Sequence, residues 1–203
     1  FMMTASLALA VVLLGGVKAA AASTATVETE QGTFTVQYGY KVDGYVLSGY
    51  QGSETDITLP ETVSISGTDT AITTLGDAFK GNKFVNSIEI PEGYTTIDLS
   101  ALEGCTGLTS VSIPGSMQTI SGTAFSGCTK LTTVTFAENA GGKLSFGNKP
   151  FNGCTSLKTI NLPIQTSDVN SDGNIFTGCT ALESITVSEG NAKYFSDNGS
   201  LYA

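Results

Sequence analysis

Residues 108–131 read LTSVSIPGSMQTISGTAFSGCTKL, and close variants of this stretch recur along most of the chain. In four copies a cysteine follows a glycine, with successive separations of 23, 26 and 25 residues, at Cys105, Cys128, Cys154 and Cys179. Asn82 holds the same place 23 residues before the first cysteine. A period of this length predicts a stack of similar coils, in which each coil buries its apolar side against its neighbours.

Each copy has the same order of residues around this place. Three positions before it stands a large apolar residue, at Phe79, Leu102, Phe125, Phe151 and Phe176. A glycine directly precedes it, as a turn with positive φ or a close backbone approach would need. The residues six and eight places after it are apolar and alternate with polar ones, which indicates a short strand with one buried face. Because proline lacks an N–H, Pro91, Pro114 and Pro163 end three of these strands. The pattern predicts a repeat solenoid with a parallel sheet of short strands, mainly β with little helix.

The four cysteines are expected to be free thiols. They share one register position, so their side chains should point inward in parallel, about 4.8 Å apart along the stack. Parallel Cβ vectors rarely bring two Cβ atoms to the roughly 3.8 Å that a disulfide needs. Asn82 in the same place supports this interpretation, because asparagine cannot be a disulfide partner.

The string L-x-x-V-S-I-P-x-x-M-x-x-I-x-x-x-A-F-x-G-C-T-x-L over residues 108–131 resembles the BspA-like leucine-rich repeat named after Treponema pallidum. The segment YGYKVDGYVLSGYQGSETDITLPETV, residues 38–63, is similar to the part that precedes the repeats in that family, where a twisted strand pair leads into an I-x-L-P coil. The resemblance covers residues 33–203 and implies a right-handed leucine-rich-repeat β-solenoid with an N-terminal β cap. Ala137 and Ser188 stand where the pattern has proline, and insertions follow the third and fourth strands, which leaves the shape of the convex side open.

We divide the chain into four segments. An apolar run over residues 5–17 is short for a bilayer span and suits a signal peptide, which we place at 1–22 with a clipped start. A linker over 23–32 and an N-terminal β cap with the first coil over 33–76 follow. The repeats occupy 77–203 and are expected to be truncated at the C-terminus, because no capping element follows them. We therefore expect a secreted or cell-surface bacterial protein whose mature chain does not insert into the membrane.

Composition excludes several kinds of function. The chain has 18 acids against 9 lysines, a formal net charge of −9, and neither arginine nor histidine. This balance opposes binding to nucleic acid or to anionic membranes. Without histidine and arginine, Ser-His-Asp and Cys-His catalysis, histidine zinc sites and arginine phosphate clamps are excluded. We expect no catalytic residues and no required cofactor.

One motif bears on metal binding, although a polar connecting loop is the favoured interpretation. Residues 168–173 read DVNSDG and match the start of a calcium loop through Asp168, Asn170 and Asp172. The twelfth position, which normally supplies a bidentate acid, is Cys179. The alternative is a polar connecting loop, because Asn, Asp, Ser and Gly are common turn residues.

The outward residues of the predicted strands form a hydroxyl-rich strip, on the face that solenoids commonly use for binding. Beside Ser87, the candidate binding residues are Glu89, Ser110, Ser112, Thr133, Thr135, Thr159, Asn161, Ser184 and Thr186. The strip lacks an aromatic or arginine anchor, and solubility with strand propensity explains each residue taken singly. Four tyrosines near the N-terminus form either a sugar-stacking platform or, as we favour, a cover for the open end of the first coil: Tyr38, Tyr40, Tyr45 and Tyr50.

The sequence therefore predicts a non-catalytic, secreted or surface-displayed module that binds a protein or extracellular-matrix ligand. The family resemblance implies adhesion to host or neighbouring cells. The alternative is a structural spacer that presents an enzymatic or cell-wall-binding C-terminal domain. A catalytic parallel β-helix acting on polysaccharide is disfavoured, because the acids share no register and arginine is absent. The sequence leaves the oligomeric state open.

Overall fold

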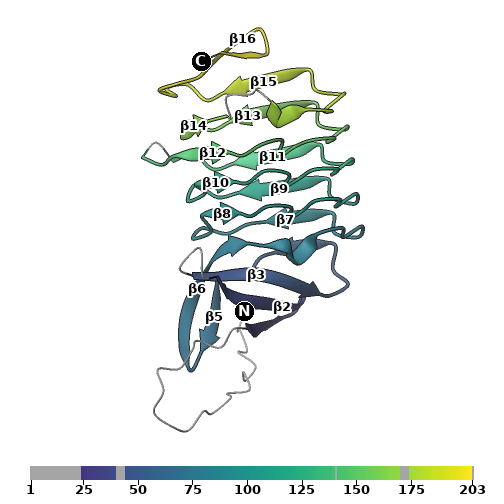
Figure 1. Cartoon of the computed structure of the whole chain (residues 1–203), viewed down its shortest axis with the longest axis vertical. Helices are drawn as coiled ribbons and strands as arrows, with labels where there is room; N and C mark the ends of the chain where they lie inside the picture. The colour runs from purple at the N-terminus through teal and green to yellow at the C-terminus, as the bar shows by residue number, and fades with distance from the viewer. Residues whose placement is uncertain (1–23, 40–43, 140, 170–173, 203) are drawn as a thin grey trace.

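Short strands stack coil upon coil along the long axis of the molecule, from the N-terminal cap to the C-terminal end (Figure 1). The structure is a computed structural model that describes residues 24–39, 44–139, 141–169 and 174–202. The predicted signal peptide, 1–22, lies outside these residues. The predicted repeat solenoid, mainly β with little helix, is confirmed: the described helical turns are η1 (Asp77–Phe79) and η2 (Asn174–Phe176), of three residues each.

The strands predicted from the repeat form one row along the stack. Three of them pair in parallel in a single sheet with β4 (Asp56–Thr58), which precedes the five repeats: β7 (Ser87–Glu89), β9 (Ser110–Ile113) and β11 (Thr133–Phe136). The next two form a separate parallel pair: β13 (Thr159–Leu162) and β15 (Ser184–Val187). The break between these two ladders coincides with the coil that carries the insertion after the third strand.

The two coils that lack proline gain a hydrogen bond instead. The N–H of Ala137 donates to Ile113 O at 2.9 Å, and the N–H of Ser188 donates to Leu162 O at 2.9 Å. Proline has no N–H and could not make these bonds. The buried side-chain amide of Gln165 bonds to the start of the insertion that follows the third strand. Its Nε2 donates to Ala137 O at 2.8 Å, and its Oε1 accepts the N–H of Asn139 at 3.0 Å. The departures from the repeat therefore leave the stacking intact.

A second row of parallel strands runs along the other side of the coils, and the sequence analysis did not predict it. Its members are β8 (Thr96–Ile97), β10 (Thr119–Ile120), β12 (Leu144–Phe146) and β14 (Thr166–Asp168). Their buried side chains include Ile97, Ile120 and Phe146. The recurrence of Thr-Ile at a spacing of 23 residues could have indicated this row, but strands of two residues are too short to show an alternating pattern.

An antiparallel cap closes the N-terminal end. It contains β1 (Thr24–Thr29), β2 (Gly32–Gly39) and β3 (Gly44–Gln51), and β3 pairs in parallel with β6 (Thr68–Leu75). A hairpin joins β5 (Thr62–Ile65) to β6 through Ser66 and Gly67, both with positive φ, as a two-residue turn of type I′ requires.

The expectation of a linker over 23–32 is wrong for residues 24–29. These residues form a strand that pairs with β2 along its whole length. From this strand, Ala25 and Val27 pack against the core. At the other end of the molecule, β16 (Phe195–Asp197) and β17 (Ser200–Tyr202) form a hairpin that contacts β15, with the N–H of Ile185 donating to Gly199 O at 2.8 Å.

The core contains a column of large apolar side chains, one from each coil. The column starts in the cap and runs in the order Phe34, Tyr50, Phe79, Leu102, Phe125, Phe151 and Phe176. Phe125 and Phe151 stack nearly parallel, with ring centroids 5.1 Å apart, and Phe151 and Phe176 are 5.7 Å apart. Stacking of this kind adds to the free energy gained by burying the rings.

The four cysteines are free and buried, as predicted. Each thiol donates to the carbonyl of the large apolar residue in the preceding coil, as Cys128 Sγ does to Leu102 O at 3.1 Å and Cys154 Sγ to Phe125 O at 3.2 Å. The hydrogen bond with the thiol of Cys105, together with burial, raises the pKa of Cys128, so this thiol stays protonated near neutral pH. All four cysteines are buried, so they pack as small apolar residues, each with one weak donor.

The glycines before the cysteines adopt the positive φ that the repeat predicts. Gly127 and Gly153 have φ of 74° and 72°. Their N–H groups bond to the following coil, as Gly127 N does to Asn152 O at 2.8 Å. A residue with a Cβ would be strained in this conformation.

Candidate binding surface

The strip of outward side chains lies on the first row of strands, opposite the core. Ile57, Ile88 and Val111 are buried at the middle of the lining of β4, β7 and β9, and the residues on either side of each point outward. This alternation is the ordinary geometry of a strand. The fold therefore uses one side of the row for packing and leaves the other side available.

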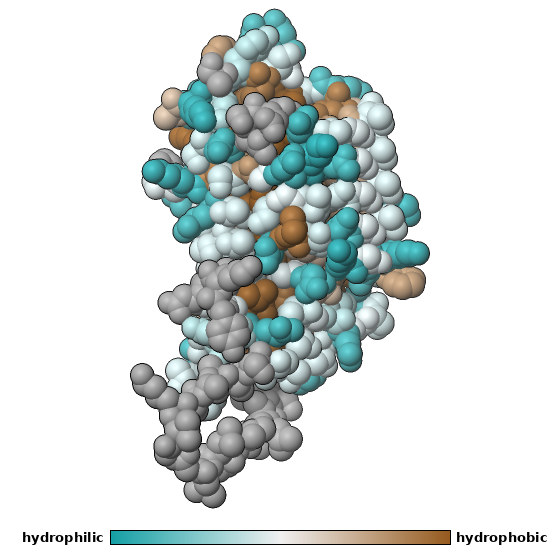
Figure 2. Space-filling model, in the orientation of Figure 1, coloured by the Kyte–Doolittle hydropathy of each residue, from teal (hydrophilic) through white to brown (hydrophobic). Residues whose placement is uncertain are grey.

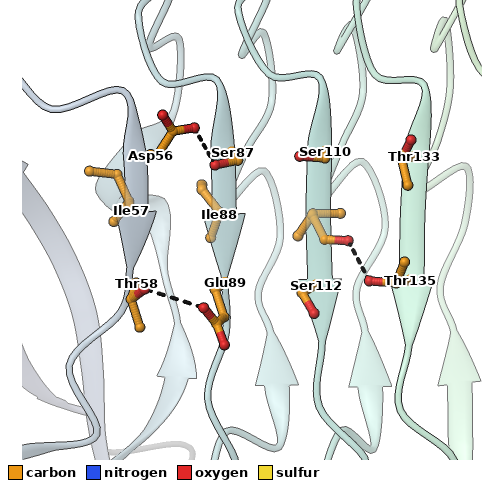
Figure 3. Close-up of a pocket in the computed structure, with 11 residues that line it drawn as sticks. Asp56, Ile57, Thr58, Ser87, Ile88, Glu89, Ser110, Ser112, Thr133 and Thr135 are labelled. Atoms are coloured by element: carbon orange, nitrogen blue, oxygen red, sulfur yellow. Dashed lines mark hydrogen bonds between the residues drawn. The ribbon is translucent and has the colours of Figure 1, made fainter.

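Between β4 and β11 the outward face forms an open groove of about 360 Å³ (Figure 3). The outward residues that line it are Asp56, Thr58, Ser87, Glu89, Ser110, Ser112, Thr133 and Thr135. The sequence analysis named six of these as strip residues and missed Asp56 and Thr58. The segment DITLP, 56–60, fits the strand-and-proline pattern and could have identified both. We refer to this hollow as the β4–β11 groove.

The N-terminal end of the groove is acidic. The Asp56 carboxylate accepts hydrogen bonds from the Ser87 hydroxyl and from Asn86 Nδ2, the latter at 3.3 Å. These bonds lower the pKa of Asp56, with that from Ser87 contributing most. Glu89 Oε2 accepts the hydroxyl of Thr58 at 3.4 Å. Two carboxyl side chains thus accept hydrogen bonds from hydroxyl groups of neighbouring strands.

The other end of the groove carries hydroxyl groups only. Thr135 Oγ1 donates to Val111 O at 3.4 Å, and next to the strands Thr132 Oγ1 donates to Thr109 O at 3.1 Å. Ser110, Ser112 and Thr133 complete this end of the lining. The groove therefore changes from acidic to neutral along the stack.

The remaining strip residues do not join the groove. Thr159, Asn161, Ser184 and Thr186 lie on the separate β13–β15 pair. Thr186 Oγ1 donates to Asn161 Oδ1 at 2.9 Å, and Asn161 Nδ2 donates to Ser188 Oγ at 3.2 Å. The predicted strip therefore consists of two separate pieces, one on the β4–β11 sheet and one on the β13–β15 pair.

A second hollow, of about 370 Å³, opens beside the cap. Its lining comes from the loop after β3 and from the turn of the first repeat: Tyr50, Gly52, Ser53, Glu54, Thr55, Asn82, Phe84 and Val85. We refer to it as the cap hollow. Phe84 is the large apolar side chain that this lining exposes, with an exposed fraction of 81%. The sequence analysis did not single out Phe84, although it is the one aromatic residue at its place in the five repeats.

The tyrosines of the cap pack inward, as favoured from the sequence. Tyr45 is buried and meets Tyr38 edge to face at 5.6 Å. Tyr50 packs between Phe34 and Phe79, and its hydroxyl donates to Gln31 O at 2.7 Å. Tyr40 lies outside the described residues.

The predicted calcium ligands are only partly described. Asp168 ends β14, whereas Asn170 and Asp172 lie outside the described residues. Cys179, at the twelfth position of the motif, is buried and its thiol donates to Phe151 O at 3.1 Å. Within the described ranges, no cluster of three or more acids and cysteines is arranged to hold a metal ion. The calcium prediction stays a prediction.

The face shown in Figure 2 is largely hydrophilic or neutral, with isolated hydrophobic residues among them. Of the described helices, none is long and apolar enough to cross a membrane. This polar face contrasts with the interior, which holds the column of large apolar side chains.

Stacked parallel coils, an apolar column and a polar strand face define a leucine-rich repeat solenoid. The chain belongs to the family of the BspA type leucine rich repeat region, whose model matches residues 70–199 in six copies. No curated protein matches the chain.

Solved structures share the fold. The leucine rich repeat protein of T. pallidum, TpLRR, is 23% identical with a TM-score of 0.64, and the match covers 75% of this chain and 68% of TpLRR. A leucine-rich repeat protein of Bacteroides ovatus is 24% identical with a TM-score of 0.60, covering 75% of this chain and 45% of that one. The pneumococcal vaccine antigen PcpA is 19% identical with a TM-score of 0.57, covering 88% and 54%. The chain thus spans about half the length of the last two proteins.

Proposed function

We propose that this chain is a non-catalytic binding module, displayed on or released from a bacterial cell, which attaches to a protein or matrix ligand in the manner of an adhesin. One observation carries the proposal. The β4–β11 groove presents eight outward polar side chains from four strands, and the core on the other side of these strands does not need them.

The family and the folds found in comparison support a surface role. The pneumococcal antigen and the T. pallidum protein share the solenoid, and repeat solenoids use their long regular surfaces for contact with other proteins. The absence of histidine and arginine and the burial of all four thiols are consistent with binding rather than catalysis.

The experiment compares the full chain with two variants on an array of matrix proteins and glycans. In the groove variant, Ser112→Tyr and Thr135→Tyr place bulky side chains on exposed positions of β9 and β11. In the control variant, Gln118→Tyr and Asn148→Tyr make the same change at exposed positions away from this row. We expect the groove variant to lose about tenfold or more in affinity and the control to bind like the natural chain. Equal binding by both variants would contradict the proposal, and no binding by any of the three would favour the spacer.

A further inference from the structure

The first repeat differs from the other four at two nearby positions, and both differences line the cap hollow. Asn82 replaces the cysteine. Two places later stands Phe84, where the other repeats have Gly107, Lys130, Ser156 and Ala181. An aromatic ring that is 81% exposed gains nothing from the core, and the repeat itself does not require it.

Asn82 changes the turn that carries Phe84. In the cysteine repeats, the N–H three places after the cysteine bonds to its backbone carbonyl, as Leu108 N does to Cys105 O at 3.1 Å. In the first repeat the Asn82 side chain takes over, because its Oδ1 accepts the N–H of Phe84 at 2.8 Å and of Val85 at 2.9 Å. The Asn82 side chain thus fixes the backbone at Phe84.

The next coil accommodates this altered turn through a glycine. A Cβ at Gly107 would collide with the carbonyl oxygen of Lys83, so only glycine fits at this place in the second repeat. The altered turn therefore lies against the backbone of the next coil, and Phe84 lines the cap hollow from this turn.

The cap hollow and the β4–β11 groove adjoin. Thr55 lines the cap hollow and Asp56, the next residue, lines the groove. Asn86 joins the two, because its N–H donates to Thr55 O at 2.6 Å and its Nδ2 donates to Asp56 Oδ1 at 3.3 Å. One binding surface therefore extends from Phe84 across the strands to β11.

The charged side chains along this surface are all acidic. They are Glu54 in the cap hollow and Asp56 and Glu89 in the groove, and no lysine lines either hollow. The salt bridge that joins Lys80 to Glu103 lies outside both. The hydrogen bonds described above lower the pKa of Asp56, so this carboxylate is ionised at neutral pH. Such a surface attracts cations and repels anions.

We propose that the joined hollows bind an extended polypeptide segment rich in lysine or arginine. One basic side chain would lie over the Phe84 ring, and others would reach Asp56 and Glu89. The three strand spacings from β4 to β11 amount to about 14 Å, which an extended segment covers with about four residues. This proposal rests on the proposed function, since it names the chemistry of the protein ligand.

The test is a fluorescence anisotropy titration of the full chain with labelled octapeptides. The peptides share the same apolar residues and differ in whether their polar positions hold lysine, serine or glutamate. We expect binding of the lysine peptide only, weakening as sodium chloride rises from about 50 to about 300 mM. Phe84→Ala should reduce the affinity about tenfold, and Asp56→Asn with Glu89→Gln should reduce it by a similar factor.

Two matched variants control for general effects. Leu99→Ala removes an exposed large apolar side chain elsewhere, and Glu189→Gln removes an exposed acid of the last repeat. Both should bind the lysine peptide as the natural chain does.

Equal binding of the serine or glutamate peptides, or unchanged binding by Phe84→Ala, would overturn the proposal. Loss of the array ligand in the groove variant, without any binding of basic peptides, would overturn this inference and leave the proposed function standing. A neutral glycan that depends on Phe84 would likewise show that the occupant is not a polypeptide.

Discussion

Replacing Phe151 by alanine tests whether the apolar column holds the coils together. Phe151 is fully buried between Phe125, at 5.1 Å, and Phe176, at 5.7 Å. Truncation of a buried phenylalanine costs about 3–5 kcal/mol, and each ring pair adds about 0.5–1.5 kcal/mol to what burial alone gives. We therefore expect Phe151→Ala to lower the free energy of unfolding by about 4 kcal/mol, a large part of the total for a typical domain.

Two further variants make the comparison specific. Phe151→Leu should cost only about 1.5 kcal/mol, because Leu102 already fills the same place in the second repeat. Phe84→Ala removes the same ring from an exposed site and should change the free energy of unfolding by less than about 0.5 kcal/mol. Urea unfolding followed by far-ultraviolet circular dichroism measures all three, since the chain has no tryptophan. If Phe151→Ala cost no more than Phe84→Ala, the column would not be the main source of cohesion between coils.

Three other predictions concern the thiols, acid stability and calcium. A thiol reagent should label none of the four cysteines rapidly in the folded chain and all four after unfolding in urea; two or fewer in the unfolded chain would contradict the free-thiol structure. Burial alone would raise the pKa of Glu92, but hydrogen bonds from Gly115 and Ser116 lower it overall. The stability that the Glu92 carboxylate contributes is therefore complete above the unfolded pKa of about 4.3 and is lost as the pH falls through the lower folded value. Glu92→Gln should melt below the natural chain at neutral pH, with a difference that closes below about pH 4; a constant difference would show that ionisation is not involved. Cys179 packs inward at the place where a calcium loop has its acidic ligand. Millimolar calcium should therefore leave the melting midpoint of both the natural chain and Asp168→Ala nearly unchanged. A rise in the melting midpoint of the natural chain alone would refute this.

The repeat made the fold predictable because each of its positions has one physical requirement. The glycines need positive φ, the cysteines need a small buried side chain, and the positions after them alternate as a strand does. The second row of strands escaped prediction, since segments such as Thr96–Ile97 are held by their neighbours along the stack rather than by a pattern of their own. β1 was not predicted for a similar reason: it is held by its pairing with β2 rather than by a pattern of its own.

The binding surface was predicted only in part. The alternation in the repeats identified Ser110, Ser112, Thr133 and Thr135 as outward, but not that the groove ends at β11. That boundary comes from the break between two ladders, which depends on the backbone path of an inserted segment. The Asn82 side chain accepts the backbone N–H groups of Phe84 and Val85, and a sequence pattern that treats Asn82 as a substitute for cysteine cannot show this turn.

The contacts between coils have a consequence for how such a gene can change in length. Each cysteine thiol donates to the carbonyl of Phe79, Leu102, Phe125 or Phe151 in the coil before it, so each of these four coils offers a carbonyl to the coil that follows. An in-frame duplication of one coil would therefore create a junction with the same chemistry as the existing ones. The length of the solenoid could then change by whole coils, while the cap hollow and the groove beside it stay unchanged at one end.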